Sequence, residues 1–186
     1  INLVRQMILT NSYEERGSII EKLLPIQKED FIELFKEMSN LPVTIRLLDP
    51  PLHEFLPNSQ QEIQKTAKIM AVTQQQLSDR IKDLSEFNPM LGTRGVRLGV
   101  MVPEIYDMQV QAIFLAAIEV FKKYQIVVNP EIMIPLISAN KEVDLVRDSI
   151  EKVFLQLNED SSVDLKYKLG VMVETPRAAL RAGDIA

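Results

Sequence analysis

The 186-residue sequence contains no cysteine and only one histidine. Without cysteine, the chain has no disulfide framework, no thiolate nucleophile and no cysteine-based zinc site. It also lacks any apolar run near the roughly 18 residues that a membrane-spanning helix needs, and its first residues resemble neither a signal nor a transit peptide. We therefore expect no membrane association and a cytoplasmic location.

Surplus basic charge is absent as well. Lys and Arg total 21 against 26 Asp and Glu, which gives a net charge of −5 and a pI near 5.1. A nucleic-acid-binding surface normally shows clustered Lys and Arg, so no nucleic-acid partner is expected. A composition of 46% hydrophobic and 25% charged residues indicates one packed domain over residues 1–186. Because no initiator methionine is present, we expect the chain to be cut from a longer protein.

Apolar residues at helical spacing predict several helices. Residues 1–41 form a helical lead-in in which Pro25 is expected to separate the last two helices. Residues 58–86 are rich in polar side chains and predict surface helices. A stronger apolar pattern predicts a largely buried helix over 104–124, and another helix is expected to begin after Asn140 as its N-cap.

Short apolar runs without alternation, each followed by a helix, are typical of a parallel sheet covered by helices, and thus of an α/β fold. In such folds chemistry collects beyond the carboxyl ends of the strands. Asp49 and Glu174 would project from two such ends, with Arg46 slightly deeper. The predicted strands are residues 42–48, 131–137 and 168–174.

Two arginine-bearing segments place guanidinium groups beside rigid turns, which is a way to hold a phosphate. One is Arg46-Leu-Leu-Asp-Pro-Pro-Leu-His-Glu-Phe-Leu-Pro57, and the other is Asn88-Pro-Met-Leu-Gly-Thr-Arg-Gly-Val-Arg97, which contains Arg94. In a third segment, Gly170-Val-Met-Val-Glu-Thr-Pro176, Glu174 supplies a carboxylate of the kind that Mg²⁺ needs when it bridges protein and phosphate. These segments suggest a site for a phosphorylated substrate.

Each of these features also has a simpler interpretation. An arginine near a turn is commonly a surface ion-pair former. Glu174 could be an acid favoured by the macrodipole at a helix N-terminus, and the glycines flanking Arg94 could mark a plain turn. Arg97 could either pair within the site or be a charge on a strand surface. A non-catalytic α/β interaction domain therefore remains an alternative.

Nearly the whole 186-residue chain resembles the phosphoenolpyruvate (PEP)-utilising enzymes. Three motifs carry the resemblance: Leu47-Leu-Asp-Pro-Pro-Leu-His-Glu-Phe55, Asn-Pro-Met-Leu-Gly-x-Arg and Gly-x-Met-Val-Glu-Thr-Pro. The double proline after Asp49 favours the dikinase branch over PEP synthase and the PEP-protein phosphotransferase of the sugar phosphotransferase system. The resemblance implies part of a (β/α)8 TIM barrel of the PEP/pyruvate-binding type, with extra N-terminal and inserted helices. Residues 42–186 would hold about four βα units, truncated at both ends, including a strand near 94–102.

The resemblance also implies a reaction, in which ATP, phosphate and pyruvate interconvert with AMP, diphosphate and PEP through a phosphohistidine. Arg46 and Arg94 match the arginines that bind the substrate phosphate, Glu174 matches a Mg²⁺ ligand, and Asp49 and Arg97 are secondary site residues. Thr93 stands where family members vary among His, Phe, Tyr and Trp. His53 is not the phosphocarrier, because the family's phosphohistidine belongs to another domain.

Other parts of the reaction would come from elsewhere in the polypeptide. The resemblance places a second Mg²⁺ ligand and a catalytic cysteine beyond Ala186, and phosphohistidine and ATP-binding domains upstream. The 186 residues alone are therefore expected to be inactive, and the full-length enzyme is expected to be a homodimer.

Overall fold

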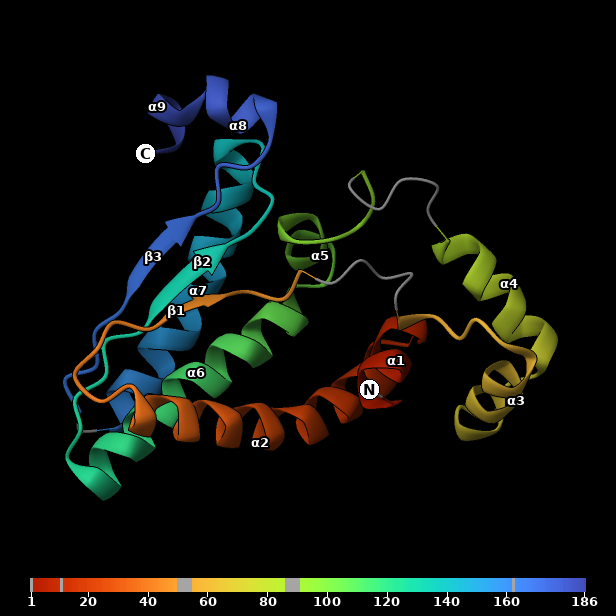
Figure 1. Ribbon diagram of the computed structural model, residues 1–186, viewed down its shortest axis with the longest axis horizontal. Helices are drawn as coiled ribbons and strands as arrows, with labels where there is room; N and C mark the ends of the chain where they lie inside the picture. The colour runs from red at the N-terminus through yellow and green to blue at the C-terminus, as the bar shows by residue number, and fades with distance from the viewer. Residues whose placement is uncertain (1, 11, 50–54, 86–90, 162) are drawn as a thin grey trace. The chain divides into compact units, whose positions relative to one another are not determined.

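The computed structural model describes residues 2–10, 12–49, 55–85, 91–161 and 163–186. The chain forms two compact units, one made of Ile1–Lys22 and Pro50–Arg94 and the other of Leu23–Asp49 and Gly95–Ala186. One long helix, α2 (Tyr13–Glu37), contributes residues to both units (Figure 1).

The described part of the first unit is helical. It contains α1 (Asn2–Leu9), the start of α2, α3 (Gln60–Ile69) and α4 (Gln74–Leu84). The two inserted helices begin at well-formed caps: the Ser59 side chain accepts from the Glu62 amide, and Thr73 and Gln76 form a reciprocal capping box. The prediction of polar surface helices over residues 58–86 is thus confirmed for α3 and α4.

The prediction that Pro25 separates two helices is wrong, because α2 continues through it from Tyr13 to Glu37. A proline inside a helix removes one backbone hydrogen bond and costs about 3 kcal/mol. Packing of the following turns offsets that cost: Ile32 and Phe35 are buried in the core of the second unit, and Phe35 stacks on Phe31 with ring centroids 6.2 Å apart. Tertiary burial therefore outweighs the local penalty.

The second unit contains a parallel sheet in the order β1-β2-β3, formed by β1 (Thr44–Arg46), β2 (Glu131–Ile134) and β3 (Lys168–Val171). Ile45 lies opposite Ile132, which in turn lies opposite Leu169. All three predicted strands are confirmed in position, but each is shorter than predicted. The second and third strands end three residues earlier than predicted, and the first is shorter by two residues at each end.

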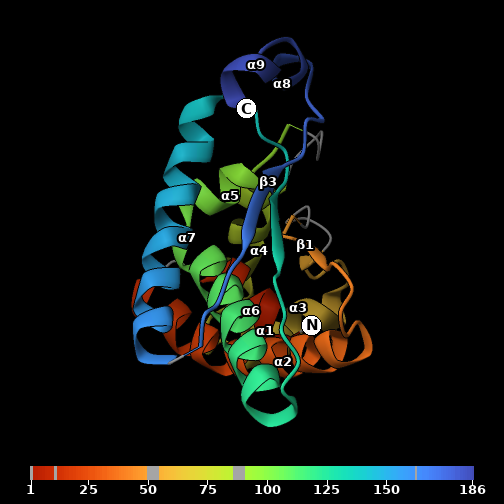
Figure 2. The ribbon, with the colours of Figure 1, turned by 90° about the vertical axis from the view of Figure 1, so that its left-hand side faces the viewer.

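Two long helices, α6 (Pro103–Tyr124) and α7 (Asn140–Ser161), lie on the same side of this sheet (Figures 1 and 2). Side chains that alternate along the strands, such as Ile45 and Ile132, are buried toward these helices, whereas Thr44 and Arg46 are exposed on the other face. The core of the unit therefore lies between the sheet and the two helices. The buried helix predicted over 104–124 is confirmed.

The strand expected near 94–102 is not observed, because Val96–Met101 forms the short helix α5. Its backbone makes helical bonds: the Gly99 amide donates to the Gly95 carbonyl, and the Val102 amide to the Leu98 carbonyl. A short apolar run does not distinguish a strand from a buried helix, which explains the error. Within the described ranges, the sheet has three strands. The α/β class is confirmed, and the partial barrel remains a prediction.

The helices after the second and third strands complete the unit. Asn140 is the first residue of α7 rather than its cap, and the Glu142 carboxylate instead accepts from the Ser138 and Ala139 amides at 2.8 and 3.0 Å. After β3 come the short helices α8 (Pro176–Leu180) and α9 (Ala182–Ile185). Across the residues that the structure describes, no helix is both long and apolar enough to span a membrane.

Candidate functional site

The carboxyl ends of the three parallel strands meet at one edge of the sheet in the second unit. Arg46 is the last residue of β1, Asp49 follows it by three residues, and Glu174 follows the end of β3 by three residues. Three of the predicted site residues therefore lie at the same edge, where α/β proteins bind ligands. The Arg46 side chain is 49% exposed and can reach a ligand.

Arg46 is oriented by an acid within its own loop. Its Nη1 lies 3.4 Å from Asp49 Oδ2, and the Asp49 side chain is only 2% exposed. A buried carboxylate needs a charged or hydrogen-bonding partner, so the pair fixes one side of the guanidinium group. Asp49 thus acts on Arg46 rather than presenting its own charge to solvent.

Two side chains of α6 contact the backbone between Arg46 and Asp49. Gln109 Oε1 accepts from the Leu48 amide at 2.8 Å, and the Tyr106 hydroxyl donates to the Leu48 carbonyl at 3.1 Å. Burial raises the pKa of Tyr106 far above its usual value, and the negative charge of Asp49 adds to this shift. Tyr106 therefore remains a protonated donor at all working pH values.

The sequence reasoning did not identify Tyr106 and Gln109. A signal for them does exist, because they are polar groups three residues apart on a helix that is otherwise mostly apolar and buried. Such a pair lies on one face of the helix and must find partners there.

Gly95 packs tightly against the same edge. Its φ is +53°, and an added Cβ would lie 2.7 Å from the Leu136 Cβ and 3.0 Å from Asp49 Oδ1. The next amide, of Val96, donates to the Pro135 carbonyl at 3.0 Å. Close packing against protein groups therefore explains this glycine without an anion. Gly92 belongs to the other unit, where its carbonyl accepts from the Arg94 amide at 3.1 Å.

Glu174 is held by the loop after β2. The Leu136 amide donates to Glu174 Oε1 at 2.7 Å, and Leu136 adopts a φ of +59°, which is uncommon for a residue other than glycine. Thr175 follows as the N-cap of α8, with its hydroxyl accepting from the Ala178 amide and donating to the Ile137 carbonyl. This left-handed backbone at Leu136 aims an amide at the carboxylate and fixes its position.

Glu174 fits a Mg²⁺ site only in part. Mg²⁺ commonly uses one or two protein carboxylates and completes its octahedral shell with water and substrate oxygens. Within the part of the chain that is described, no group of three or more His, Cys, Asp or Glu side chains is arranged to hold a metal. These residues therefore supply one carboxylate, and other ligands must come from the substrate, water or further residues.

The other predicted site residues do not stand at the ends of the strands. Arg94 is the last residue of the first unit and precedes Gly95 of the second, so its convergence with Arg46 stays a prediction. Arg97 lies on α5 and is partly buried. His53, the double proline and Asn88 to Met90 lie outside the described residues.

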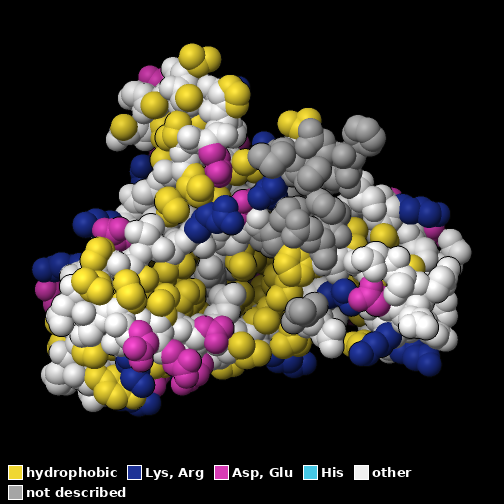
Figure 3. Space-filling view, in the orientation of Figure 1, with side chains coloured by type: hydrophobic (Ala, Val, Ile, Leu, Met, Phe, Trp, Pro, Cys, Tyr) yellow, Lys and Arg dark blue, Asp and Glu magenta, His cyan; other side chains and the backbone are white. Residues whose placement is uncertain are grey.

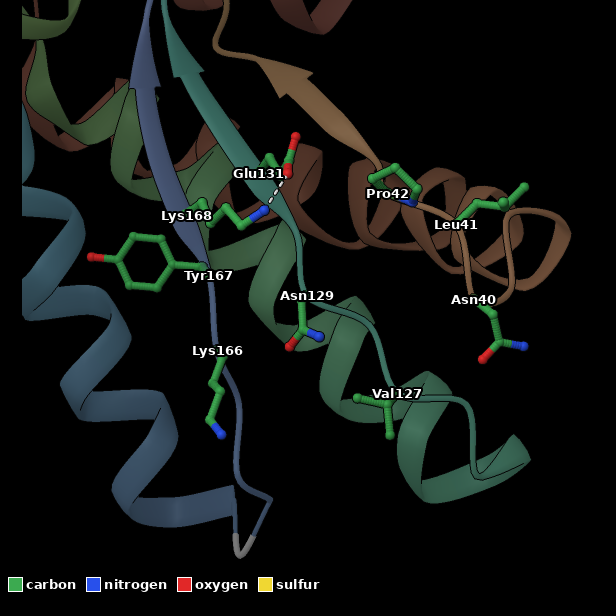
Figure 4. A pocket seen from close by; sticks show the side chains of 9 residues that line it. All are labelled: Asn40, Leu41, Pro42, Val127, Asn129, Glu131, Lys166, Tyr167 and Lys168. Carbon is green, nitrogen blue, oxygen red and sulfur yellow. Dashed lines mark hydrogen bonds and ion pairs between the residues drawn. The ribbon is translucent and has the colours of Figure 1, made fainter.

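A cavity lies at the opposite edge of the sheet, beside the amino ends of the strands (Figure 4). It measures about 670 Å³. In its wall, the Glu131 carboxylate accepts from the Thr44 hydroxyl at 2.6 Å and from Lys168 Nζ at 2.9 Å, and both hydrogen bonds lower the pKa of Glu131. Hydrophobic side chains gather over this end of the strands (Figure 3). The cavity is therefore separate from the candidate site. Its lining residues are Asn40, Leu41, Pro42, Val127, Asn129, Glu131, Lys166, Tyr167 and Lys168.

Comparison with known proteins defines the class of this chain. All of residues 1–186 match the family described as "PEP-utilising enzyme, PEP-binding domain", so the chain belongs to the PEP-utilising enzymes and corresponds to their PEP-binding domain. This confirms the family resemblance inferred from the sequence motifs.

Similar proteins within the family are pyruvate, phosphate dikinases. The chain is 48% identical over 186 residues to that of Rhizobium meliloti (strain 1021) and 44% identical over 183 residues to that of Clostridium symbiosum. It is 46% identical over 192 aligned residues to pyruvate, phosphate dikinase 2 of Oryza sativa subsp. japonica. The matches cover 98% to 100% of this chain, which spans only 21% of the length of each relative.

Proposed function

We propose that this chain is the PEP/pyruvate-binding part of a pyruvate, phosphate dikinase, which interconverts ATP, phosphate and pyruvate with AMP, diphosphate and PEP. The observation that carries the proposal is the placement of Arg46, Asp49 and Glu174 at one sheet edge in a chain that matches dikinases along its whole length. The same relatives do not favour PEP synthase or the sugar-system phosphotransferase.

The winding of the sheet supports a partial TIM barrel of the PEP/pyruvate-binding type. The strands lie in sequence order, and the helices α6 and α7, which connect them, lie on the same face. Right-handed crossover connections produce this arrangement when each one adds the next strand on the same side of the sheet. When such connections continue until the sheet closes on itself, they produce a barrel. A doubly wound sheet would instead place helices on both faces.

The chemistry of the site follows from the charges at the carboxyl edge. Arg46, held from one side by Asp49, would offer its remaining donors to the phosphate of PEP, and Arg94 would supply a second fork. Arg97 would pair within the site as a secondary contact. Glu174, fixed by the Leu136 amide, would hold Mg²⁺, which when bound would stabilise the enolate charge of pyruvate.

The same proposal covers the parts of the enzyme that this chain does not supply. The phosphohistidine, the nucleotide site, a second metal ligand and the catalytic cysteine would come from the rest of the polypeptide. A homodimeric, cytoplasmic enzyme is proposed on the same basis.

Calorimetric titration of PEP in the presence of Mg²⁺ tests this function in the full-length polypeptide. R46A and R94A should each weaken PEP binding by about 10- to 100-fold, because each removes charge-assisted hydrogen bonds worth roughly 1.5–3 kcal/mol. R147A is a matched control, since Arg147 pairs with Asp144 on the exposed side of α7, and it should bind PEP like the unsubstituted protein. Equal affinity in all four proteins would favour the interaction-domain alternative.

A further inference from the structure

The backbone that carries Arg46 and Asp49 leaves the sheet immediately after β1. The last sheet bond of this strand runs from the Leu47 amide to the Met133 carbonyl at 2.9 Å. At Leu48, side chains of α6 bind the backbone instead. Gln109 accepts from the Leu48 amide, and the Tyr106 hydroxyl donates to the Leu48 carbonyl. The position of this strand exit is therefore set by one helix face.

Gln109 makes two contacts with the strand exit. Its Oε1 accepts from the Leu48 amide at 2.8 Å, and its Nε2 lies 3.5 Å from the Arg46 carbonyl. The residue is only 5% exposed, and a buried amide group is costly unless both of its ends find partners. An apolar side chain would fill the same space on this mostly buried helix. The specific effect of the Gln109 side-chain amide is therefore on the backbone of Arg46 and Leu48, which it contacts.

Tyr106, about one turn earlier on α6, donates to the carbonyl of the same Leu48. Its ring is 2% exposed and occupies space left by Gly99, where an added Cβ would lie 2.4 Å from the ring. Residues three apart on a helix share a face, so Tyr106 and Gln109 form one rigid support. Two charges next to this support are Arg46, which is proposed to bind the substrate phosphate, and Asp49, which orients Arg46.

We propose that Gln109, assisted by Tyr106, is a positioning residue for PEP binding. It fixes the backbone from Arg46 to Leu48, and thereby the buried Asp49 and the guanidinium group that Asp49 orients. This inference rests on the proposed function, because it assigns the role of a support to the same phosphate site. Misplacing a phosphate-binding group by a small distance weakens the interaction strongly, even when the group itself is retained.

Steady-state kinetics of the full-length enzyme in the direction that consumes PEP provide the test. Q109M replaces the amide by an apolar chain of similar length, and it should raise the KM for PEP about tenfold while leaving the KM for AMP unchanged. Y106F removes only the contact with the Leu48 carbonyl and should raise the KM for PEP about threefold. Q111M is the matched control, because Gln111 lies about 200° around the same helix, and it should change neither constant.

A second readout separates positioning from general stability. Hydrogen exchange of the Leu48 amide should be faster in Q109M than in Q111M, while the two variants unfold at similar temperatures. An unchanged KM for PEP in Q109M would overturn the inference, as would a loss of thermal stability with equal rises in both KM values. If the unsubstituted enzyme does not turn over PEP, the proposed function itself fails, and the inference fails with it.

Discussion

At the scale of single residues, the site depends on backbone conformations that few residue types tolerate. Leu136 adopts a positive φ and presents its amide to Glu174, while Gly95 adopts a positive φ and packs against Leu136. A positive φ at a residue other than glycine persists only where the surrounding structure imposes it. At Leu136 this conformation holds a carboxylate at the same sheet edge as the Arg46–Asp49 pair.

Replacing Gly95 tests this tight packing. G95A should lower the free energy of unfolding by about 1–3 kcal/mol, because the new methyl group would clash with Leu136 and Asp49 and because alanine disfavours a positive φ. Urea unfolding measures the change. G17A is the control, since Gly17 lies in α2 with open space around it, and it should be neutral or stabilising by up to about 1 kcal/mol. A G95A variant as stable as the unsubstituted chain would contradict the described packing.

At the scale of elements, α6 joins the site to the core. Its apolar residues pack under the sheet, while Phe114 contacts Phe154 of α7 and Tyr167 before β3, with ring centroids 5.5 and 5.2 Å apart. On nearly the same face, seven residues earlier, Asp107 also contacts α7: its Oδ1 accepts from the Ser149 hydroxyl at 2.5 Å. The helix that supports the strand exit is therefore itself fixed by aromatic packing and by this polar contact.

The partial burial of Asp107 predicts a pH dependence of stability. Burial raises the pKa of Asp107, so the folded state binds a proton more tightly than the unfolded state. This favourable contribution is complete below the ordinary aspartate pKa of 3.8 and is lost as the pH rises through the raised folded value. At neutral pH, the ionised carboxylate therefore costs stability.

D107N should consequently raise the unfolding temperature at pH 7, and the gain should disappear when the pH falls below the ordinary aspartate range. The amide oxygen can still accept from Ser149, and the gain should stay below about 1 kcal/mol because Asp107 is only half-buried. D144N is the control, as the exposed Asp144–Arg147 pair should give a small loss instead. Thermal unfolding at several pH values distinguishes these outcomes, and a D107N gain that persists at low pH would contradict the assigned cause.

At the scale of the whole molecule, the sequence predicted the α/β class, the three strand positions, the buried helix over 104–124 and the edge shared by Arg46, Asp49 and Glu174. These predictions succeeded because each rests on local patterns of burial and on the rule that parallel strands end at one edge. The continuation of α2 through Pro25 and the helix at Val96 escaped prediction, since packing decides both. Gln109 and Tyr106 escaped as well, because their partner Leu48 is 61 and 58 residues away along the chain, respectively.

Because the proposed function places several catalytic groups elsewhere in the polypeptide, it makes a prediction for the 186 residues alone. The purified chain should show no pyruvate-dependent consumption of ATP, because the proposed histidine carrier, nucleotide site and catalytic cysteine lie in other parts of the polypeptide. A coupled assay for AMP formation measures this activity, with the full-length polypeptide as the positive control. Turnover by the isolated chain would show that these 186 residues hold a complete active site.

The most direct test of the proposed site is a crystal structure of the full-length protein with PEP and Mg²⁺ bound. The account predicts that the guanidinium groups of Arg46 and Arg94 both lie within hydrogen-bonding distance of the PEP phosphate and that Glu174 coordinates the metal. PEP bound elsewhere, or Arg94 directed away from the phosphate held by Arg46, would contradict it.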